Sequence, residues 1–600
     1  MNPQRKSALS GAGAYLVGAA VAAALSACAE PLPRGAADEW AFAPDRVALT
    51  YGFDGMVSST DRVASEIGVE VLRRGGNAVD AAVATHFALA VVNPEAGNIG
   101  GGGYIVLRMG DGRTASLDFR ESAPLAASPA LYVDEDGDPT MASRVGHLAA
   151  GVPGSVAGMW EAHLRYGSLP WEELVQPAVR LAEGIVVHER LAASLRRHEE
   201  RLRRHPATAA AFLPGGRAPR VGEWLRQPDL AATLHRIADH GRDGFYRGRT
   251  AELIAEEMLR GGGILTREDL ERYAALWREP LSFTYRGHEI VSMSPSSSGG
   301  ATMALILNML EGYDLQAMGH LSPEHVHTWT EAVKRAFADR NTYLADPDFD
   351  EPPTRTMTSK TYAHLRRSEI SPRRATPSIE VLPGIGSPER GAATSTTREG
   401  ENTTHFSIVD RFGNAVALTT TLNSLYGSLV TVAGAGFLLN NEMDDFAVRP
   451  GTPNQFGLVE GEANKVAPGK RMLSSMAPTV VLDREGRLKL VTGSPGGPAI
   501  ITTVAQILSN MIDFDLDLAR ATAAPRLHHQ HLPDVLRYER DGLAPDLVAA
   551  LRALGHFVQG RPGYSGDAQS IVVLPDGRLI GAADPRRGGA AVAVRDAAPL

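Results

Sequence analysis

The fold is decided by the stretch Glu401-Asn402-Thr403-Thr404-His405-Phe406-Ser407-Ile408-Val409. It opens a β-rich region, directly after a connector that is dense in Pro, Ser, Arg and Thr. If the peptide bond before Thr403 is cleaved, this residue carries both a hydroxyl and a free α-amine, and the amine can accept the hydroxyl proton. An unperturbed α-amine has a pKa of about 8, so part of it is neutral at neutral pH. Paired threonines at a strand start also arise from β propensity alone, so the nucleophile is one of two interpretations here.

The bulk composition is that of a large globular protein. The chain has 600 residues, of which 44% are hydrophobic and 22% charged, and its net charge is -9. This length predicts two large units or one elaborate domain. Neither a basic stripe nor an alternation of basic and aromatic residues occurs, so nucleic acid is not an expected partner.

The first 28 residues are typical of a signal peptide. Arg5 and Lys6 precede an apolar run, residues 12–25, that is shorter than a membrane span. The run ends in Leu25-Ser26-Ala27-Cys28, which resembles the lipobox of bacterial lipoproteins, where the cysteine is lipidated. We therefore expect a lipid anchor on Cys28 and a location in the periplasm or cell envelope; an ordinary cleavage site is the alternative. Cys28 is the only cysteine, so no disulfide forms within the chain.

The remaining sequence divides at the connector. Residues 56–92 predict two Ala-rich helices separated at Gly75-Gly76, with Ser59 or Thr60 capping the first. A further helix begins at Ser322-Pro323. The connector, residues 366–402, has little apolar content to bury, so we expect it to be exposed or mobile.

After the connector the sequence predicts three β-hairpins. They pair residues 405–410 with 415–421, 478–482 with 488–492, and 570–574 with 579–582. Gly and Asp in the intervening turns supply the unusual dihedral angles that tight turns require. Antiparallel strands that are covered by helices from both halves predict an α+β layered sandwich.

Several motifs, in a fixed order along the chain, resemble the γ-glutamyltranspeptidase (glutathione hydrolase) family of N-terminal-nucleophile hydrolases. Besides the Thr403 stretch, they lie at residues 75–82, 97–104, 117–121, 421–423, 440–446, 474–476 and 493–497. The resemblance runs from about Arg46 to near the C-terminus. It implies a four-layer αββα sandwich, a γ-glutamyl amide such as glutathione as substrate, and no cofactor.

The resemblance also assigns residues to the α-carboxylate of the glutamyl group. Arg120 matches the guanidinium that binds it, which suits a bidentate contact. Ser474 and Ser475 match hydroxyl donors that complete this pocket. Without the resemblance, Arg120 reads as a surface partner of Asp118 or Glu121, and the serines as turn residues.

For the α-ammonium the matching residues are Asn423, Glu442 and Asp445. Carboxylates near a buried cation make electrostatic sense, because an unpaired buried ammonium is costly. Some relatives have Gln in place of Glu442. Asp444 and Asp445 also fit a solvated turn, and only Asp445 is assigned.

Three further residues match the catalytic machinery of the family. The backbone N–H groups of Gly496 and Gly497 lie just before a helix that begins near Ala499, where they suit an oxyanion. A Gly-rich turn into a helix is the alternative. Thr421 matches the residue whose hydroxyl contacts the nucleophile.

The resemblance implies a self-cleaving zymogen. Cleavage between Asn402 and Thr403 gives a large piece, residues 29–402, and a small catalytic piece, residues 403–600, which remain associated as a heterodimer. Thr403 then forms a γ-glutamyl ester that is passed to water or to an amino acid or peptide. The expected activities are γ-glutamyltransferase and glutathione hydrolase.

The chain departs from the family pattern in the loop 453–459, which matches a lid loop that covers the pocket in some bacterial members. Phe456 stands where those members often have Tyr, so it cannot supply a phenolic hydrogen bond to Asn423, and we expect weaker or differently gated closure of this lid.

Two other motifs, a histidine cluster and a Gly-rich run, do not indicate a metal or nucleotide site. His528, His529 and His531 lack further ligands that would complete a metal site, so no metal is expected. The Gly-rich run 97–103 lacks the ending of a phosphate loop.

Three other functions remain open. A cephalosporin-type acylase has the same fold and nucleophile but less need for the full set of carboxylate and ammonium ligands. A lipoprotein that binds γ-glutamyl peptides without catalysis is the second alternative. A structural envelope protein is the third and simplest.

Overall fold

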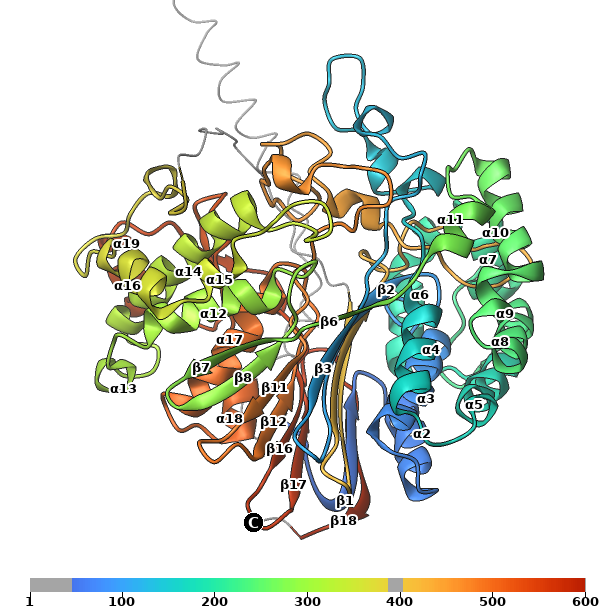
Figure 1. Ribbon diagram of the computed structural model, residues 1–600, viewed down its shortest axis with the longest axis horizontal. Helices are drawn as coiled ribbons and strands as arrows, with labels where there is room; N and C mark the ends of the chain where they lie inside the picture. The colour runs from blue at the N-terminus through green and yellow to red at the C-terminus, as the bar shows by residue number, and fades with distance from the viewer. Residues whose placement is uncertain (1–45, 387–402, 599–600) are drawn as a thin grey trace, which may run out of the picture. The chain divides into compact units, whose positions relative to one another are not determined.

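The Thr-rich stretch forms a hairpin in the middle of the main sheet of the protein. A computed structural model describes residues 46–386 and 403–598 (Figure 1). In it, strand β9 (Thr404–Asp410) pairs antiparallel with β10 (Ala415–Thr421). The other two predicted hairpins are also present, as β11 (Thr479–Leu482) with β12 (Leu488–Thr492) and β16 (Gln569–Val573) with β17 (Leu579–Ala583).

Thirteen strands form one hydrogen-bonded series that is bent into two layers. In the first layer the order is β6 (Leu276–Arg278), β3 (Thr114–Phe119), β2 (Gly102–Arg108), β10, β9 and β1 (Leu49–Ser59), with β18 (Ala590–Asp596) also paired to β1. The second layer continues through β17, β16, β12, β11, β8 (His288–Ser292) and β7 (Leu281–Tyr285).

Strand β1 joins the two layers. Its residues 49–52 pair with β17, whereas residues 55–59 pair with β9. Between them Asp54 and Gly55 have φ angles of 66° and 136°, so the strand bends at a bulge. Because of this bend, β9 packs face to face against β16 and β12.

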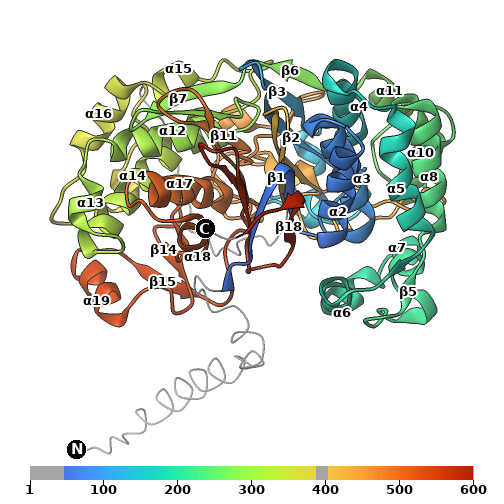
Figure 2. The same ribbon diagram turned by 90° about the horizontal axis from the view of Figure 1, so that it is seen from below.

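Helices cover the outer face of each layer (Figures 1 and 2). The first group packs on outward-facing side chains of the first layer, such as Phe406, Ile408 and Leu418. This group comprises α2 (Arg62–Arg73), α3 (Ala78–Val92), α4 (Ser155–Tyr166), α5 (Trp171–Glu183), α6 (Glu189–Leu202), α7 (Pro206–Phe212), α8 (Pro228–His240), α9 (Asp243–Tyr246), α10 (Gly248–Gly261) and α11 (Arg267–Arg272).

The second helical group lies on the other side of the sandwich. It comprises α12 (Gly299–Leu310), α13 (Leu315–Met318), α14 (Pro323–Tyr343), α15 (Thr354–Met357), α16 (Lys360–Ser368), α17 (Ala499–Ile512), α18 (Leu518–Ala523) and α19 (Pro545–Ala553). A three-stranded sheet of β13 (Leu527–His528), β14 (Leu536–Glu539) and β15 (Val558–Arg561), and the pair β4 (Ile185–Val186) and β5 (Trp224–Leu225), complete the regular elements. The predicted αββα sandwich is confirmed.

Two details at the N-terminal end differ from the prediction. Residues 56–59 belong to β1 rather than to a helix, because their backbone pairs with β9 on one side and β18 on the other, and their side chains are buried. The cap of α2 is Asp61, whose carboxylate accepts a hydrogen bond from the Val63 backbone N–H. Helix α14 does begin after Ser322 as predicted.

The described part of the connector is exposed for most of its length but is held at defined points. His531 contacts the carbonyl oxygens of Ser378 and Val381 at 2.9 and 3.0 Å. The Ser378 backbone N–H donates to Asp534 Oδ2 at 2.8 Å. These contacts join residues on opposite sides of the predicted cleavage position, so the connector is anchored here rather than free.

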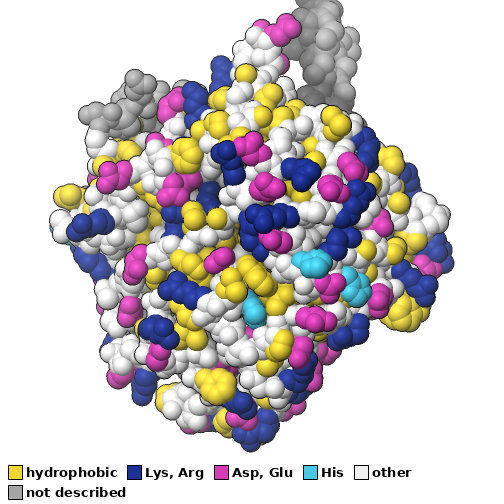
Figure 3. Space-filling model, turned by 45° about the vertical axis from the view of Figure 1, so that its right-hand side comes forward, with side chains coloured by type: hydrophobic (Ala, Val, Ile, Leu, Met, Phe, Trp, Pro, Cys, Tyr) yellow, Lys and Arg dark blue, Asp and Glu magenta, His cyan; other side chains and the backbone are white. Residues whose placement is uncertain are grey.

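The charged side chains at the surface are mixed in sign, as the sequence predicts. On the face shown in Figure 3, acidic and basic side chains are interspersed and form no single basic stretch. No helix among the described residues is both long and apolar enough to cross a bilayer. Cys28, Asn402 and the predicted signal peptide lie outside the described residues.

Candidate active site

A small pocket gathers most of the residues that the sequence motifs singled out. It holds about 360 Å³ of space between atoms, part of it open to solvent, and it lies beside the start of β9. Its walls include Arg120, Thr403, Thr421, Asn423, Glu442, Asp445, Phe456, Ser474, Ser475 and Gly497, which come from both sides of the predicted cleavage position. Gly496 is adjacent in sequence but is not part of the wall.

Thr403 contacts Thr421 directly. Its Oγ1 donates a hydrogen bond to Thr421 Oγ1 at 3.0 Å, because antiparallel pairing of β9 and β10 puts these strand ends side by side. Thr421 Oγ1 also accepts from the backbone N–H of Asn423 at 2.8 Å. Thr403 is 5% exposed and has a φ of 79°, which is unfavourable for a β-branched residue. The Thr403 hydroxyl is therefore buried, and the backbone that carries it is strained.

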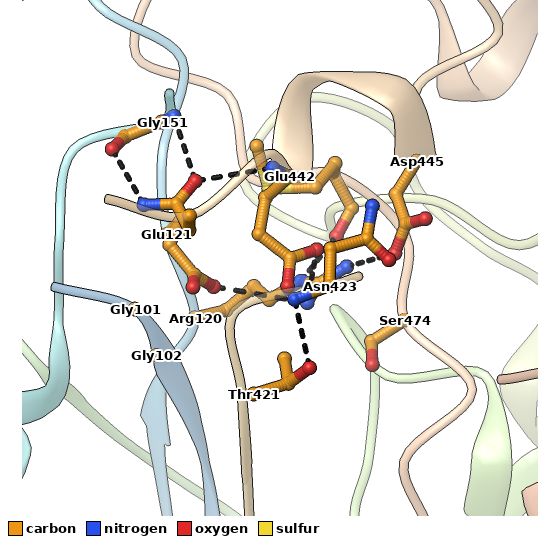
Figure 4. Close-up of polar contacts among 12 residues, drawn as sticks. Gly101, Gly102, Arg120, Glu121, Gly151, Thr421, Asn423, Glu442, Asp445 and Ser474 are labelled. Atoms are coloured by element: carbon orange, nitrogen blue, oxygen red, sulfur yellow. Dashed lines mark hydrogen bonds and ion pairs between the residues drawn. The ribbon is translucent and has the colours of Figure 1, made fainter. Parts of the chain in front are cut away.

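Arg120 follows β3 and is buried among carboxylates (Figure 4). Its Nη1 lies 2.7 Å from Glu442 Oε2, and its Nη2 lies 2.5 Å from Asp445 Oδ2. Its Nε donates to the carbonyl oxygen of Met472 at 3.2 Å. Arg120 thus contacts two of the residues assigned to the ammonium.

The carboxylates outnumber the cation that they surround. Glu121, which the sequence analysis did not assign to the site, lies 3.7 Å from Arg120 Nη1, and none of the described atoms hydrogen-bonds to its carboxyl group. Burial, only partly opposed by Arg120, raises the pKa of Glu121 to about 8. Burial also raises the pKa of Glu442 and of Asp445. At neutral pH this cluster therefore holds bound protons.

Asp444 and Asp445, adjacent in a short 3₁₀ helix (Glu442–Asp445), point to different partners. Asp444 binds Arg144 Nε at 3.0 Å and Ser143 Oγ at 2.8 Å, whereas Asp445 reaches Arg120. This arrangement agrees with assigning Asp445 alone to the pocket.

One of the two serines, Ser475, is held by a second buried arginine, Arg340, that the sequence analysis missed. Ser474 Oγ accepts a hydrogen bond from the Met476 backbone N–H at 3.1 Å. Arg340 Nη2 donates to Ser475 Oγ at 3.2 Å. Arg340 and its ion-pair partner Glu460 also line the pocket. The available signal was the set of charged residues on a helix that also has an apolar residue at each helical turn: Glu331, Lys334, Arg335, Asp339 and Arg340.

Gly496 and Gly497 adopt conformations that suit the predicted oxyanion hole. Their φ angles are 135° and 57°, and α17 begins two residues later. No described backbone carbonyl accepts a hydrogen bond from the N–H of either glycine. Ser494 Oγ, just before them, accepts from the Asp567 backbone N–H at 2.9 Å, which fixes the loop.

The loop that carries Phe456 lies closed over the pocket. Phe456 is 5% exposed, and its carbonyl oxygen accepts from Gln530 Nε2 at 3.0 Å. Gln455 Oε1 accepts from Ser424 Oγ at 2.9 Å, and the Gln455 backbone N–H donates to Asp444 Oδ2 at 2.9 Å. Closure therefore does not require a phenol at position 456.

The three histidines near the C-terminus make ordinary structural contacts. His528 contacts Thr502 Oγ1 at 3.0 Å, and His529 contacts Asp534 at 3.2 Å. Within the described ranges, no group of His, Cys, Asp and Glu side chains is arranged to hold a metal ion.

The raised pKa of Glu121 makes stability depend on pH. The unfolded chain loses this proton above a pKa of 4.5, whereas the folded chain keeps it up to about pH 8. This contribution to the free energy of unfolding therefore falls as pH rises between these values, by about 1.4 kcal/mol per unit, and levels off above pH 8. We expect Glu121→Gln to gain stability relative to wild type as pH rises from 5 to 8, measured by urea unfolding. Glu66→Gln, at an exposed helix position, is the control; parallel pH profiles for wild type and Glu121→Gln would contradict the assignment.

Comparisons with known proteins indicate the same family as the sequence motifs that meet in the pocket. The family model for gamma-glutamyltranspeptidase matches residues 64–594. The glutathione hydrolase proenzyme of Escherichia coli (strain K12) is 46% identical over 576 residues, which cover 96% of each chain. The crystal structure of cephalosporin acylase from Bacillus halodurans superimposes with a TM-score of 0.80 at 28% identity, covering 94% of this chain and 98% of that one.

The crystal structure of Helicobacter pylori gamma-glutamyltranspeptidase superimposes with a TM-score of 0.53 at 44% identity. The match covers 96% of that chain but 55% of this one. By the match to the family model and by its identity to the Escherichia coli protein over nearly the whole length, the chain belongs to the γ-glutamyltranspeptidase family.

Proposed function

We propose that this protein is a γ-glutamyltransferase and glutathione hydrolase that uses Thr403 as its nucleophile. The observation that carries the proposal is one pocket that Thr403, with its hydroxyl hydrogen-bonded to Thr421, lines together with Arg120 and the carboxylates. The 46% identity to a glutathione hydrolase proenzyme supports the same activity.

The proposal begins with self-cleavage. Thr403 Oγ1 attacks the carbonyl carbon of Asn402, the C–N bond breaks, and the hydroxyl proton passes to the departing amine. The resulting ester is hydrolysed by water, which leaves a carboxylate on Asn402 and a free amine on Thr403. The positive φ of Thr403 favours this step, since cleavage releases backbone strain of roughly 1–3 kcal/mol.

Turnover then uses the freed amine. It takes the Thr403 hydroxyl proton as Oγ1 attacks the γ-carbonyl carbon of the donor, and Gly496 and Gly497 stabilise the oxyanion. The leaving amine departs with a proton, and a γ-glutamyl ester remains on Thr403. Water or an acceptor amine then attacks this ester and restores the hydroxyl.

Recognition of the donor rests on an exchange of charge partners. The substrate α-carboxylate binds Arg120 together with Ser474 and Ser475, and the α-ammonium binds Glu442, Asp445 and Asn423. The 2.5–2.7 Å contacts between Arg120 and these two carboxylates support the exchange, because they bring both ligand sets to adjacent positions.

Replacing Thr403 tests the mechanism. Thr403→Ala should remain a single uncut polypeptide and should not release a chromogenic amine, because both steps need the hydroxyl. Thr403→Ser retains a hydroxyl, so it should cleave and turn over more slowly. A denaturing gel, N-terminal sequencing of the smaller fragment and hydrolysis of γ-glutamyl-p-nitroanilide give the readouts. A cleaved and active Thr403→Ala variant refutes the proposal; saturable binding by an uncut, inactive wild type would indicate the non-catalytic alternative.

A second comparison separates this function from that of an acylase. Glutaryl-p-nitroanilide differs from the γ-glutamyl donor only in lacking the α-ammonium. A charge-assisted contact predicts that kcat/KM for the γ-glutamyl donor is about 10- to 100-fold higher. Asp445→Asn should narrow this ratio, whereas Asp138→Asn, at an exposed position, should not. Equal kcat/KM values for both donors in the wild type would favour the acylase.

We further propose that Cys28 is lipidated and anchors the protein in the cell envelope, on the basis of the Leu25-Ser26-Ala27-Cys28 motif. In a bacterial host, wild type should fractionate with membranes and incorporate labelled palmitate. Cys28→Ala should do neither. Recovery of unlabelled wild type in the periplasmic fraction would indicate an ordinary signal peptide instead.

A further inference from the structure

Arg340, which the proposed mechanism does not use, is buried at the pocket wall. It belongs to α14, 1% of its surface is exposed, and each of its three guanidinium nitrogens has a hydrogen-bond partner. Nε donates to Ser298 Oγ at 3.0 Å, Nη1 to Asn341 Oδ1 at 3.0 Å, and Nη2 to Ser475 Oγ at 3.2 Å. Nη1 also forms an ion pair with Glu460.

The contact with Ser298 extends to the neighbouring serine of the pocket. Ser298 Oγ and the Ser298 backbone N–H both donate to the carbonyl oxygen of Ser474, at 2.6 and 2.7 Å. The Ser474 backbone N–H donates in turn to the Ser296 carbonyl at 3.1 Å. Arg340 therefore fixes the Ser475 hydroxyl directly and the Ser474 backbone through one intermediate residue.

Glu460 connects the same arginine to the loop over the pocket. The Glu460 side chain also accepts from Asn464 Nδ2, which donates to the Asp445 carbonyl at 2.7 Å. The Glu460 carbonyl accepts from the Gly451 backbone N–H at 2.9 Å, so both ends of the lid segment 451–460 meet here. Glu460 also balances a buried charge that would otherwise be costly.

We propose that Arg340 is a positioning residue for the α-carboxylate of the donor. It orients Ser474 and Ser475 toward the carboxylate bound by Arg120, and Glu460 extends this support to the lid segment. This inference rests on the proposed γ-glutamyl specificity. It assigns Arg340 no contact with the reacting atoms.

The test compares donors with and without the α-carboxylate. γ-Glutamyl-p-nitroanilide carries it, and 4-aminobutyryl-p-nitroanilide lacks only this group. Arg340→Met should raise KM for the first donor by about 10- to 100-fold with a smaller change in kcat. The reason is that the two serine hydroxyls lose their orientation, and with it their hydrogen bonds to the donor carboxylate. Its kcat/KM for the second donor should stay within about twofold. Glu460→Gln, a milder change that keeps Arg340, should shift KM in the same direction by less.

Arg335→Met is the matched control. Arg335 lies on the same helix, is equally buried and pairs with Glu331 at 2.7 Å, but it does not line the pocket. Arg335→Met should change kcat/KM for both donors by the same factor. If Arg340→Met also changes kcat/KM for both donors by the same factor, Arg340 has only a structural role and the proposal is overturned.

Equilibrium binding keeps this test separate from the proposed activity. L-Glutamate and 4-aminobutyrate are titrated calorimetrically into wild type, Arg340→Met and Glu460→Gln. Selective weakening of L-glutamate binding by about tenfold or more supports the positioning role even if wild type hydrolyses no γ-glutamyl amide. Equal L-glutamate affinity in wild type and in both variants overturns it. Should Arg340→Met fail to fold, Glu460→Gln alone decides between these outcomes.

Discussion

The pocket is organised by a single buried guanidinium with too many carboxylates around it. Arg120 can neutralise one negative charge, yet Glu121, Glu442 and Asp445 all lie close to it, and burial raises the pKa of each. A buried cluster of this kind is stable only when protons or a ligand balance it. In the proposed donor complex, the zwitterion adds no net charge, so the bound protons remain and only the charge partners are exchanged. The donor carboxylate replaces a protein carboxylate at Arg120, and the donor ammonium pairs with the carboxylate that was displaced.

The sandwich brings the reacting groups to this cluster from separate strands. Thr403 precedes β9, Thr421 ends the adjacent β10, and Gly496 and Gly497 follow β12 in the opposite layer. Because β9 packs on β12, Thr403, the proposed nucleophile, and the predicted oxyanion donors lie at the same edge of the two layers. His405 packs between the two layers: its ring lies against Gly493, where a Cβ would come within 2.3 Å of the imidazole. The position of Thr403 thus depends on layer packing as much as on hydrogen bonds within one sheet.

The sequence alone predicted a structural element correctly where its local signal agreed with the tertiary structure. The three hairpins follow from alternating strands joined by Asp- and Gly-containing turns, and Ser322 caps α14 as its position predicts. The cap of α2 was misplaced because Ser59, Thr60 and Asp61 all suit a cap, and only the length of β1 selects Asp61. Arg340 and Glu121 were missed for a related reason. A charged residue in a helix or beside a strand reads as solvent-exposed until the fold shows that it is buried.

The lid illustrates how a substitution is interpreted differently once its surroundings are known. Phe456 in place of Tyr removes a phenolic hydrogen bond, and from the sequence this predicts weaker or differently gated closure. In the structure, however, the loop is held through its backbone and its neighbour: Gln530 binds the Phe456 carbonyl, and Gln455 binds Ser424. Ser424 also accepts from Asn441 Nδ2 at 3.0 Å, and the Asn441 carbonyl accepts from Asn423 Nδ2 at 2.9 Å. The lid is thus still linked to Asn423, through Gln455, Ser424 and Asn441 rather than through one aromatic hydroxyl. Phe456 itself lines the pocket with an apolar side chain, so the hydrogen bonds that hold the loop do not depend on the ring at this position.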